Sequence, residues 1–236
     1  MISRTLRQLY DDHKGKVSDK WSSYLEAYDD IFLPYRGQQV RLLEIGVQNG
    51  GSLEIWLKYF PKAALLLGCD IDEACRALRF DDPRIQLVIG DANTDEAQSE
   101  ILRLSNEFDL IIDDGSHHSR DIVSTFSRYF PYLKADGVYV AEDIHCSYWR
   151  RFQGGLFDPL SSMTFFKRLA DLVNFEHWGV TGKRTDLLRS FAESYGCVSS
   201  VEDLASVYSV EFRNSICIVR KKKIPKREST PLSEVI

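Results

Sequence analysis

The chain has 236 residues, of which 44% are hydrophobic and 28% charged, a balance typical of a soluble protein with one large domain and a substantial core. Its formal net charge of -5 argues against nucleic acid as the main partner, no apolar run is long enough to span a membrane, and the N-terminus lacks the apolar core of a signal peptide. The five cysteines are scattered without a CxxC spacing, which indicates reduced thiols in a cytoplasmic protein and argues against a disulfide framework or a zinc site.

The N-terminal segment, residues 1–36, is polar with interspersed aromatic residues and precedes the first predicted core strand. We therefore expect it to form a helical cap or lid. Ser18 is a candidate N-cap for a helix that runs from Asp19 toward Tyr35. Position alone suggests that three side chains of this segment close over a bound cofactor: Lys20, Trp21 and Tyr24.

Short apolar runs that alternate with helical segments indicate the fold class. Strands are predicted at residues 40–45, 64–69, 85–89, 108–112 and 137–141. A helix is predicted after the first strand, at residues 52–60, and another between the last two, at 120–133. This alternation predicts a doubly wound, Rossmann-like α/β fold with a mostly parallel sheet of seven strands, two of which come from the C-terminal part of the chain.

The C-terminal part has a different pattern. Helices are predicted at residues 162–177 and around 186–195, and two β-rich runs at 205–212 and 215–220 predict an antiparallel hairpin at the sheet edge. Residues 37–220 would then form the main domain. The charged segment 221–236 contains two prolines, and we expect it to be a mobile tail.

Three successive strand ends carry residues that suit a nucleoside ligand. The first is a glycine-rich turn, residues 46–51, which lacks the dinucleotide fingerprint GxGxxG because Gln48 occupies the place of its second glycine. Asp70 ends the second strand, where an acid can accept from ribose hydroxyls, and Asp91 ends the third. The turn therefore favours a nucleoside without a pyrophosphate. The candidate cofactor-binding residues are Glu44, Gly46, Asn49, Gly50, Ser52, Asp70, Asp91 and Asp113.

Four acids follow the next two strands. Asp113 and Asp114 close one apolar run, and Glu142 and Asp143 close the other. Because a helix joins the two strands, they are expected to lie close together in a parallel sheet, where ligands bind at the carboxyl ends. Carboxylates that crowd one crevice repel each other unless protons or a cation neutralise them. The crowding predicts a hard cation such as Mg²⁺.

The motifs Asp113-Asp114-Gly115-Ser116-His117-His118 and Glu142-Asp143-Ile144-His145, with Ser147-Tyr148-Trp149, resemble those of the metal-dependent sugar O-methyltransferases of macrolide and rhamnosyl antibiotic biosynthesis. That group of class I S-adenosylmethionine-dependent methyltransferases also includes proteins labelled cephalosporin hydroxylases. The resemblance extends from about residue 18 to residue 220 and is loose after Trp149. It implies S-adenosylmethionine and Mg²⁺ as cofactors. It also implies that Asp114, Glu142 and Asp143 bind the metal and that His117 is the general base.

The chemistry of the residues agrees with this resemblance. A sugar hydroxyl is a poor nucleophile while it is protonated, and a bound cation lowers its pKa and holds it against the methyl donor. A histidine three residues beyond Asp114 can then accept the proton. The resemblance implies a small sugar-type acceptor. Tyr148 and Trp149 could stack on it or belong to the core, and the sequence leaves open whether the chain forms a homo-oligomer.

Two other functions stay open at this point. His117 and His118, with one carboxylate, could form the iron site of a non-haem oxygenase, although adjacent side chains seldom converge on one ion. The chain could also be a non-catalytic nucleoside-binding protein, in which the four acids would have no purpose. A structural role for His118 and His145 is as reasonable as a functional one.

Overall fold

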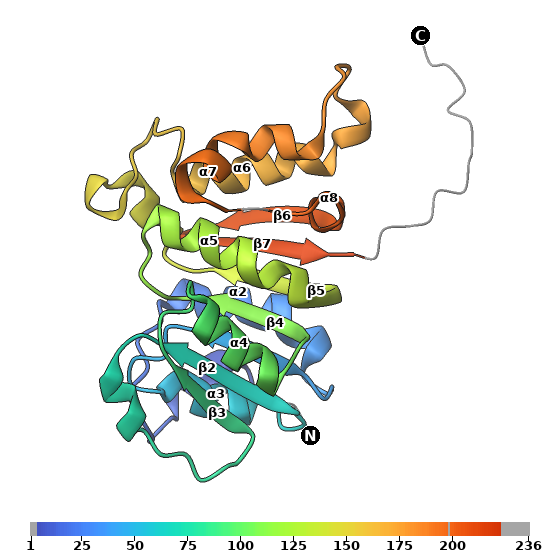
Figure 1. The fold of residues 1–236 in the computed structure, drawn as a ribbon. Coiled ribbons are helices and arrows are strands. Elements are labelled where there is room, and N and C mark those ends of the chain that lie inside the picture. Colours follow the sequence, from blue (N-terminus) through green and yellow to red (C-terminus); the bar gives the residue numbers. More distant parts are fainter. Residues whose placement is uncertain (1–3, 198, 223–236) are drawn as a thin grey trace.

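The computed structural model describes residues 4–197 and 199–222, which form a seven-stranded sheet with helices on both faces (Figure 1). The strand order is β3-β2-β1-β4-β5-β7-β6, and all neighbours are parallel except the pairs made by β7, which are antiparallel. The strands are β1 (Arg41–Ile45), β2 (Leu65–Asp70), β3 (Ile85–Ile89), β4 (Phe108–Asp113), β5 (Leu133–Ala141), β6 (Val207–Arg213) and β7 (Ile216–Lys221). The predicted fold class, including the C-terminal hairpin, is confirmed.

Eight α-helices lie in the described part of the chain, and two core clusters divide most of them between the faces of the sheet. The helices are α1 (Leu6–Asp11), α2 (Ser22–Phe32), α3 (Gly51–Tyr59), α4 (Asp95–Leu104), α5 (Ser119–Tyr129), α6 (Ser162–Val173), α7 (Arg189–Tyr195) and α8 (Val201–Ala205). Side chains of α1 to α3 pack in one cluster, and those of α4 to α8 pack in the other. No helix among the described residues is both long and apolar enough to span a membrane.

The strands supply both clusters because successive side chains of a strand point to opposite faces. In β4, Leu110 and Ile112 belong to the cluster of α1 to α3, while Ile111 belongs to the other. In β5, Val140 belongs to the cluster of α1 to α3, while Tyr139 belongs to the other. Both faces are therefore buried, which explains why these strands have continuous apolar sequences.

The N-terminal segment packs against the sheet as part of this core. In α2, Leu25, Tyr28 and Phe32 are almost completely buried, and Tyr28 packs edge-to-face on Trp56 of α3 with 5.2 Å between ring centroids. The expectation that Ser18 caps α2 is wrong, because the helix begins only at Ser22, after an extended Trp21. Residues 12–21 cross between the helices without helical structure, and this path carries the side chain of Lys20 to the carboxyl ends of the central strands.

The other differences concern the ends of elements: β5 begins at Leu133, four residues before the predicted strand, and the helix before it ends at Tyr129. The hairpin strands end one residue later than predicted, and the turn between them places Ser215 at a φ of 66°. The helix predicted at residues 162–177 ends at Val173, and a short 3₁₀ turn follows it. The predicted mobile tail lies outside the described residues apart from 221 and 222, and Lys221 is the last residue of β7.

Candidate functional site

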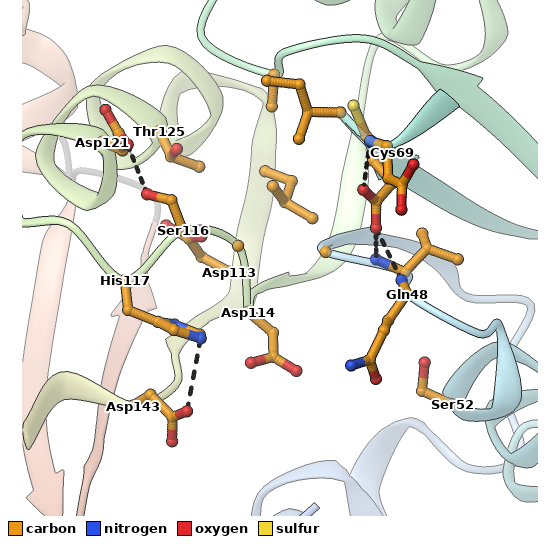
Figure 2. A pocket seen from close by; sticks show the side chains of 18 of the residues that line it. Gln48, Ser52, Cys69, Asp113, Asp114, Ser116, His117, Asp121, Thr125 and Asp143 are labelled. Carbon is orange, nitrogen blue, oxygen red and sulfur yellow. Dashed lines mark hydrogen bonds and ion pairs between the residues drawn. The ribbon is translucent and has the colours of Figure 1, made fainter. Parts of the chain in front are cut away.

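A cavity of about 480 Å³ opens at the carboxyl ends of β1 to β4 (Figure 2). It lies where the connections from neighbouring strands, β1 and β4, run to opposite faces of the sheet, which is the usual ligand position in an open α/β sheet. Residues 17–20 of the N-terminal segment contribute to its wall. The glycine-rich turn therefore shares one space with Asp114 after β4 and Asp143 after β5.

The glycine-rich turn after β1 is held in a fixed shape. Gly46 has a φ of 89°, and a Cβ atom there would lie 2.0 Å from the carbonyl oxygen of Asp114, so only glycine fits. One carboxylate oxygen of Asp70 accepts from the backbone N–H groups of Val47 and Gln48, both at 2.7 Å (Figure 2). Asp70 thus joins the end of β2 to the turn after β1.

The structure places the predicted cofactor-binding residues in two groups. Five line the cavity: Gly46, Ser52, Asp70, Asp91 and Asp113. The other three, Glu44, Asn49 and Gly50, are not among the lining residues that the structure describes. Glu44 is completely buried beneath the turn and accepts a 2.7 Å hydrogen bond from the hydroxyl of Ser52, while Gly50 is the left-handed N-cap residue just before α3.

At the end of the cavity near β5, Asp114, His117 and Asp143 converge (Figure 2), and we call these three residues the acid cluster. One possible ligand atom from each of these side chains lies within 4.8 Å of the others. Nε2 of His117 is 3.6 Å from Oδ2 of Asp143. His117 and Asp143 both have left-handed backbone conformations, with φ of 58° and 50°, and this strained geometry directs two non-glycine residues toward one point.

Glu142 lies deeper than Asp143. Its Oε1 accepts from the ammonium of Lys20 at 2.6 Å and from the hydroxyl of Tyr28 at 2.5 Å. Burial raises the pKa of Glu142, the nearby charge of Asp114 raises it further, and Lys20 opposes both. The predicted third metal ligand therefore uses one oxygen to bind the N-terminal segment.

Of the three N-terminal side chains expected to close over a cofactor, Lys20 lines the cavity and Trp21 and Tyr24 do not, and the sequence did not indicate the ion pairs that Lys20 makes. Its side chain is 4% exposed, and its ammonium also lies 2.9 Å from Oδ2 of Asp114 and 3.4 Å from Oε1 of Glu44. Burial by itself lowers the pKa of Lys20, but the charges of the three surrounding carboxylates hold it well above its usual value. Tyr24 adds a 2.6 Å hydrogen bond from its hydroxyl to Asp143.

Asp113 differs from Asp114 because adjacent residues at a strand end point to opposite sides. Its carboxylate is buried and accepts a 3.0 Å hydrogen bond from the hydroxyl of Tyr139. Burial raises the pKa of Asp113 to about 7. Asp113 thus supports the floor of the cavity, while Asp114 faces His117 and Asp143.

The other two histidines of the motifs are not part of this cluster, although Nδ1 of His145 lies 3.9 Å from Oδ1 of Asp143. His118 precedes α5, with Nδ1 3.1 Å from the carbonyl oxygen of Ser116 and its ring against Phe152. Among the described residues, the cluster that could hold a metal therefore contains one histidine, and the two-histidine iron site considered above does not form. His145 contacts the hydroxyl of Ser215 and stacks on Trp21.

Comparison with known proteins agrees with this geometry. Residues 43–144 match a family model described as a methyltransferase domain. The chain contains a methyltransferase domain. It is 38% identical over 164 residues to the 8-demethyl-8-alpha-L-rhamnosyl tetracenomycin-C 2'-O-methyltransferase of Streptomyces olivaceus, a match that covers 65% of this chain and 42% of that protein. It is also 38% identical over 160 residues to the mycinamicin VI 2''-O-methyltransferase of Micromonospora griseorubida, covering 63% and 39%.

A solved structure resembles nearly the whole chain. The MycE methyltransferase of the mycinamycin biosynthetic pathway, in complex with Mg, SAH and mycinamycin VI, aligns with a TM-score of 0.77 and 25% identity. The alignment covers 98% of this chain and 58% of MycE. The two O-methyltransferases named above are longer than this chain. The chain spans less than half the length of each of them.

Proposed function

We propose that this chain is an S-adenosylmethionine- and Mg²⁺-dependent O-methyltransferase that acts on a hydroxyl group of a sugar or a glycosylated small molecule. The observation that carries the proposal is the shared cavity, in which a glycine-rich turn without a pyrophosphate fingerprint faces the cluster of Asp114, His117 and Asp143. The relatives named above methylate glycosylated natural products, according to their names.

The residues fit both cofactors. Gly46 lines the cavity without a side chain, so a ligand can approach the backbone of the turn, and carboxylates at the ends of β2 and β3 suit the hydroxyl and amino groups of a nucleoside. The acid cluster is rich in oxygen donors, which Mg²⁺ prefers. The proposed ligands are Asp114 and Asp143 with Glu142 as the third carboxylate, and a bound ion would lower the pKa of the acceptor hydroxyl.

His117 is the proposed general base. Its ring is about one-quarter exposed, so an acceptor can reach Nε2, the atom that faces Asp143 at 3.6 Å. This nitrogen would take the proton from the acceptor hydroxyl, and Asp143 would stabilise the imidazolium that forms. Tyr24 holds the other oxygen of Asp143 and thereby fixes the direction of the pair.

The test is a binding measurement followed by a transfer assay. S-adenosylhomocysteine at 100 times its dissociation constant should add about 2.7 kcal/mol to the unfolding free energy, whereas NAD should add nothing. For a domain of this size that corresponds to a rise of roughly 5–10 °C in the melting temperature. Methyl transfer from labelled S-adenosylmethionine to a rhamnosyl glycoside should require Mg²⁺. Stabilisation by NAD alone, or full activity in excess chelator, would contradict the proposal.

A further inference from the structure

A row of aromatic rings borders the acid cluster on the side of β5. We call it the aromatic rim and define it as Trp21, His145, Trp149 and Phe152. The centroids of Trp21 and His145 are 5.0 Å apart, those of His145 and Trp149 are 5.0 Å apart, and those of Trp149 and Phe152 are 6.1 Å apart. The row therefore joins the N-terminal segment to the 3₁₀ turns that follow β5.

Both tryptophans of the aromatic rim are open to solvent, Trp21 being 47% exposed and Trp149 44%. Large aromatic side chains gain most by burial, so two half-exposed indoles beside one site indicate a surface that a ligand covers. None of the rim residues is among those that line the cofactor cavity. The rim is thus a second surface, separate from the nucleoside site.

The rim reaches the reacting groups at both ends. At one end the ring of Phe152 lies 6.4 Å from that of His117. At the other, Trp21 stacks at 5.6 Å on Tyr24, whose hydroxyl donates to Asp143. A molecule that rests on the rim is therefore adjacent to the proposed base.

The backbone holds the rim in place before any ligand arrives. The carbonyl oxygen of Ser147 accepts from Gly155 at 2.9 Å, and a Cβ atom on Gly154 would lie 2.0 Å from the same oxygen. The guanidinium of Arg151 lies 4.9 Å from the ring centroids of both Trp149 and Phe152. Such a preorganised surface loses little freedom when a ligand binds.

We propose that the aromatic rim, through Trp149 and Trp21, binds the sugar ring of the acceptor and directs one of its hydroxyls toward His117. The assignment rests on the proposed function, since the site then needs an acceptor beside the base. A pyranose has an apolar C–H face that packs on an indole and polar edges that remain in water. Because the rim ends beside His117, the occupant that the proposed reaction requires there is the sugar ring that carries the reacting hydroxyl.

The test observes the tryptophans directly and does not depend on catalysis. The chain has four: Trp21, Trp56, Trp149 and Trp178. The protein would be labelled with 5-fluorotryptophan, its ¹⁹F resonances assigned by single substitutions, and methyl α-L-rhamnopyranoside added in the presence of Mg²⁺ and S-adenosylhomocysteine. The resonances of Trp21 and Trp149 should shift saturably, whereas those of the buried Trp56 and of Trp178 should not. Glycerol, a polyol without a ring face, should shift none of them.

Substitution provides the second readout. Trp149→Ala should weaken rhamnoside affinity on the order of tenfold, Trp149→Phe should restore part of it, and stabilisation by S-adenosylhomocysteine should be unchanged in both. Phe157→Ala is the matched control, because Phe157 is 92% exposed and lies outside the rim. Unchanged rhamnoside affinity in Trp149→Ala, or the absence of a saturable shift at Trp21 and Trp149, would overturn the proposal. Rhamnoside binding at the rim without methyl transfer would instead contradict the proposed function and leave only the rim's binding of a sugar ring supported.

Discussion

Replacing Lys20 by methionine tests whether the N-terminal segment is held by charge. Methionine keeps most of the length and apolar contact of the side chain and removes only the ammonium. The ammonium lies 2.6 Å from Glu142 and 2.9 Å from Asp114, and the Lys20 side chain is 4% exposed. The substitution would leave buried carboxylates without their cation, and such groups are costly to desolvate.

The size of the effect follows from two opposing contributions. At an effective dielectric constant of ~20, two unit charges 2.6 Å apart attract by roughly 6 kcal/mol, and most of this offsets the cost of removing the ammonium from water. Removal of one partner from a buried ion pair usually costs about 3–5 kcal/mol, because the remaining charge stays buried. We therefore expect Lys20→Met to lower the unfolding free energy by about 3–5 kcal/mol.

Urea unfolding at pH 7.5 with a chelator present measures this difference without a contribution from metal. Lys16→Met is the matched control: its ammonium pairs with Glu54 at 2.6 Å, but both side chains are more than one-fifth exposed, so a loss below about 1 kcal/mol is expected. Adding Glu142→Gln to Lys20→Met should recover part of the lost stability, because it removes the unpaired charge. Equal effects of Lys20→Met and Lys16→Met would refute the reasoning.

Three further predictions concern the cavity. His117→Ala should lower turnover by roughly 10²- to 10⁴-fold and leave the melting-temperature shift with S-adenosylhomocysteine unchanged, whereas His118→Ala should cost much less. Asp113→Asn should become more stable relative to the parent chain as pH rises from 5 to 8 in urea titrations, by about 2–3 kcal/mol. The sign follows because a folded-state pKa of about 7, against about 3.9 unfolded, makes stability fall as the carboxyl ionises. Asp70→Ala should weaken S-adenosylhomocysteine binding in calorimetry because it frees the turn at Val47, and unchanged affinity would contradict that role.

The sheet could be predicted from the sequence because its information is local. Each parallel strand is an apolar run with a turn or an acid after it, and β3 begins and ends at the predicted residues. Helix α1 was not predicted, because six residues give too short a hydrophobic period. Its start nevertheless has a local signal, the capping box in which Thr5 accepts from the backbone of Gln8 while the Gln8 side chain accepts from the backbone of Thr5.

The site could be predicted only where it depends on strand ends. Asp114, His117 and Asp143 come together as the position of their motifs suggested, since the carboxyl ends of neighbouring parallel strands meet. Glu142 is buried, whereas Asp143 lines the cavity. This difference depends on the direction in which each side chain points after the strand ends. That in turn depends on the left-handed conformation of Asp143, which has no signal in the sequence.

The contacts of the N-terminal segment could not be predicted because they join residues far apart in the chain. Lys20 meets Asp114 across 94 positions and Glu142 across 122. Tyr24 and Tyr28 follow it at intervals of four, so α2 presents both hydroxyls on one face, to Asp143 and Glu142. The segment that matches the methyltransferase family model, residues 43–144, contains the acids but none of these three partners. The part of the chain that fixes the charge and direction of the site thus lies outside that matched segment. For this reason the function is best tested on the whole chain, with residues 4–42 present.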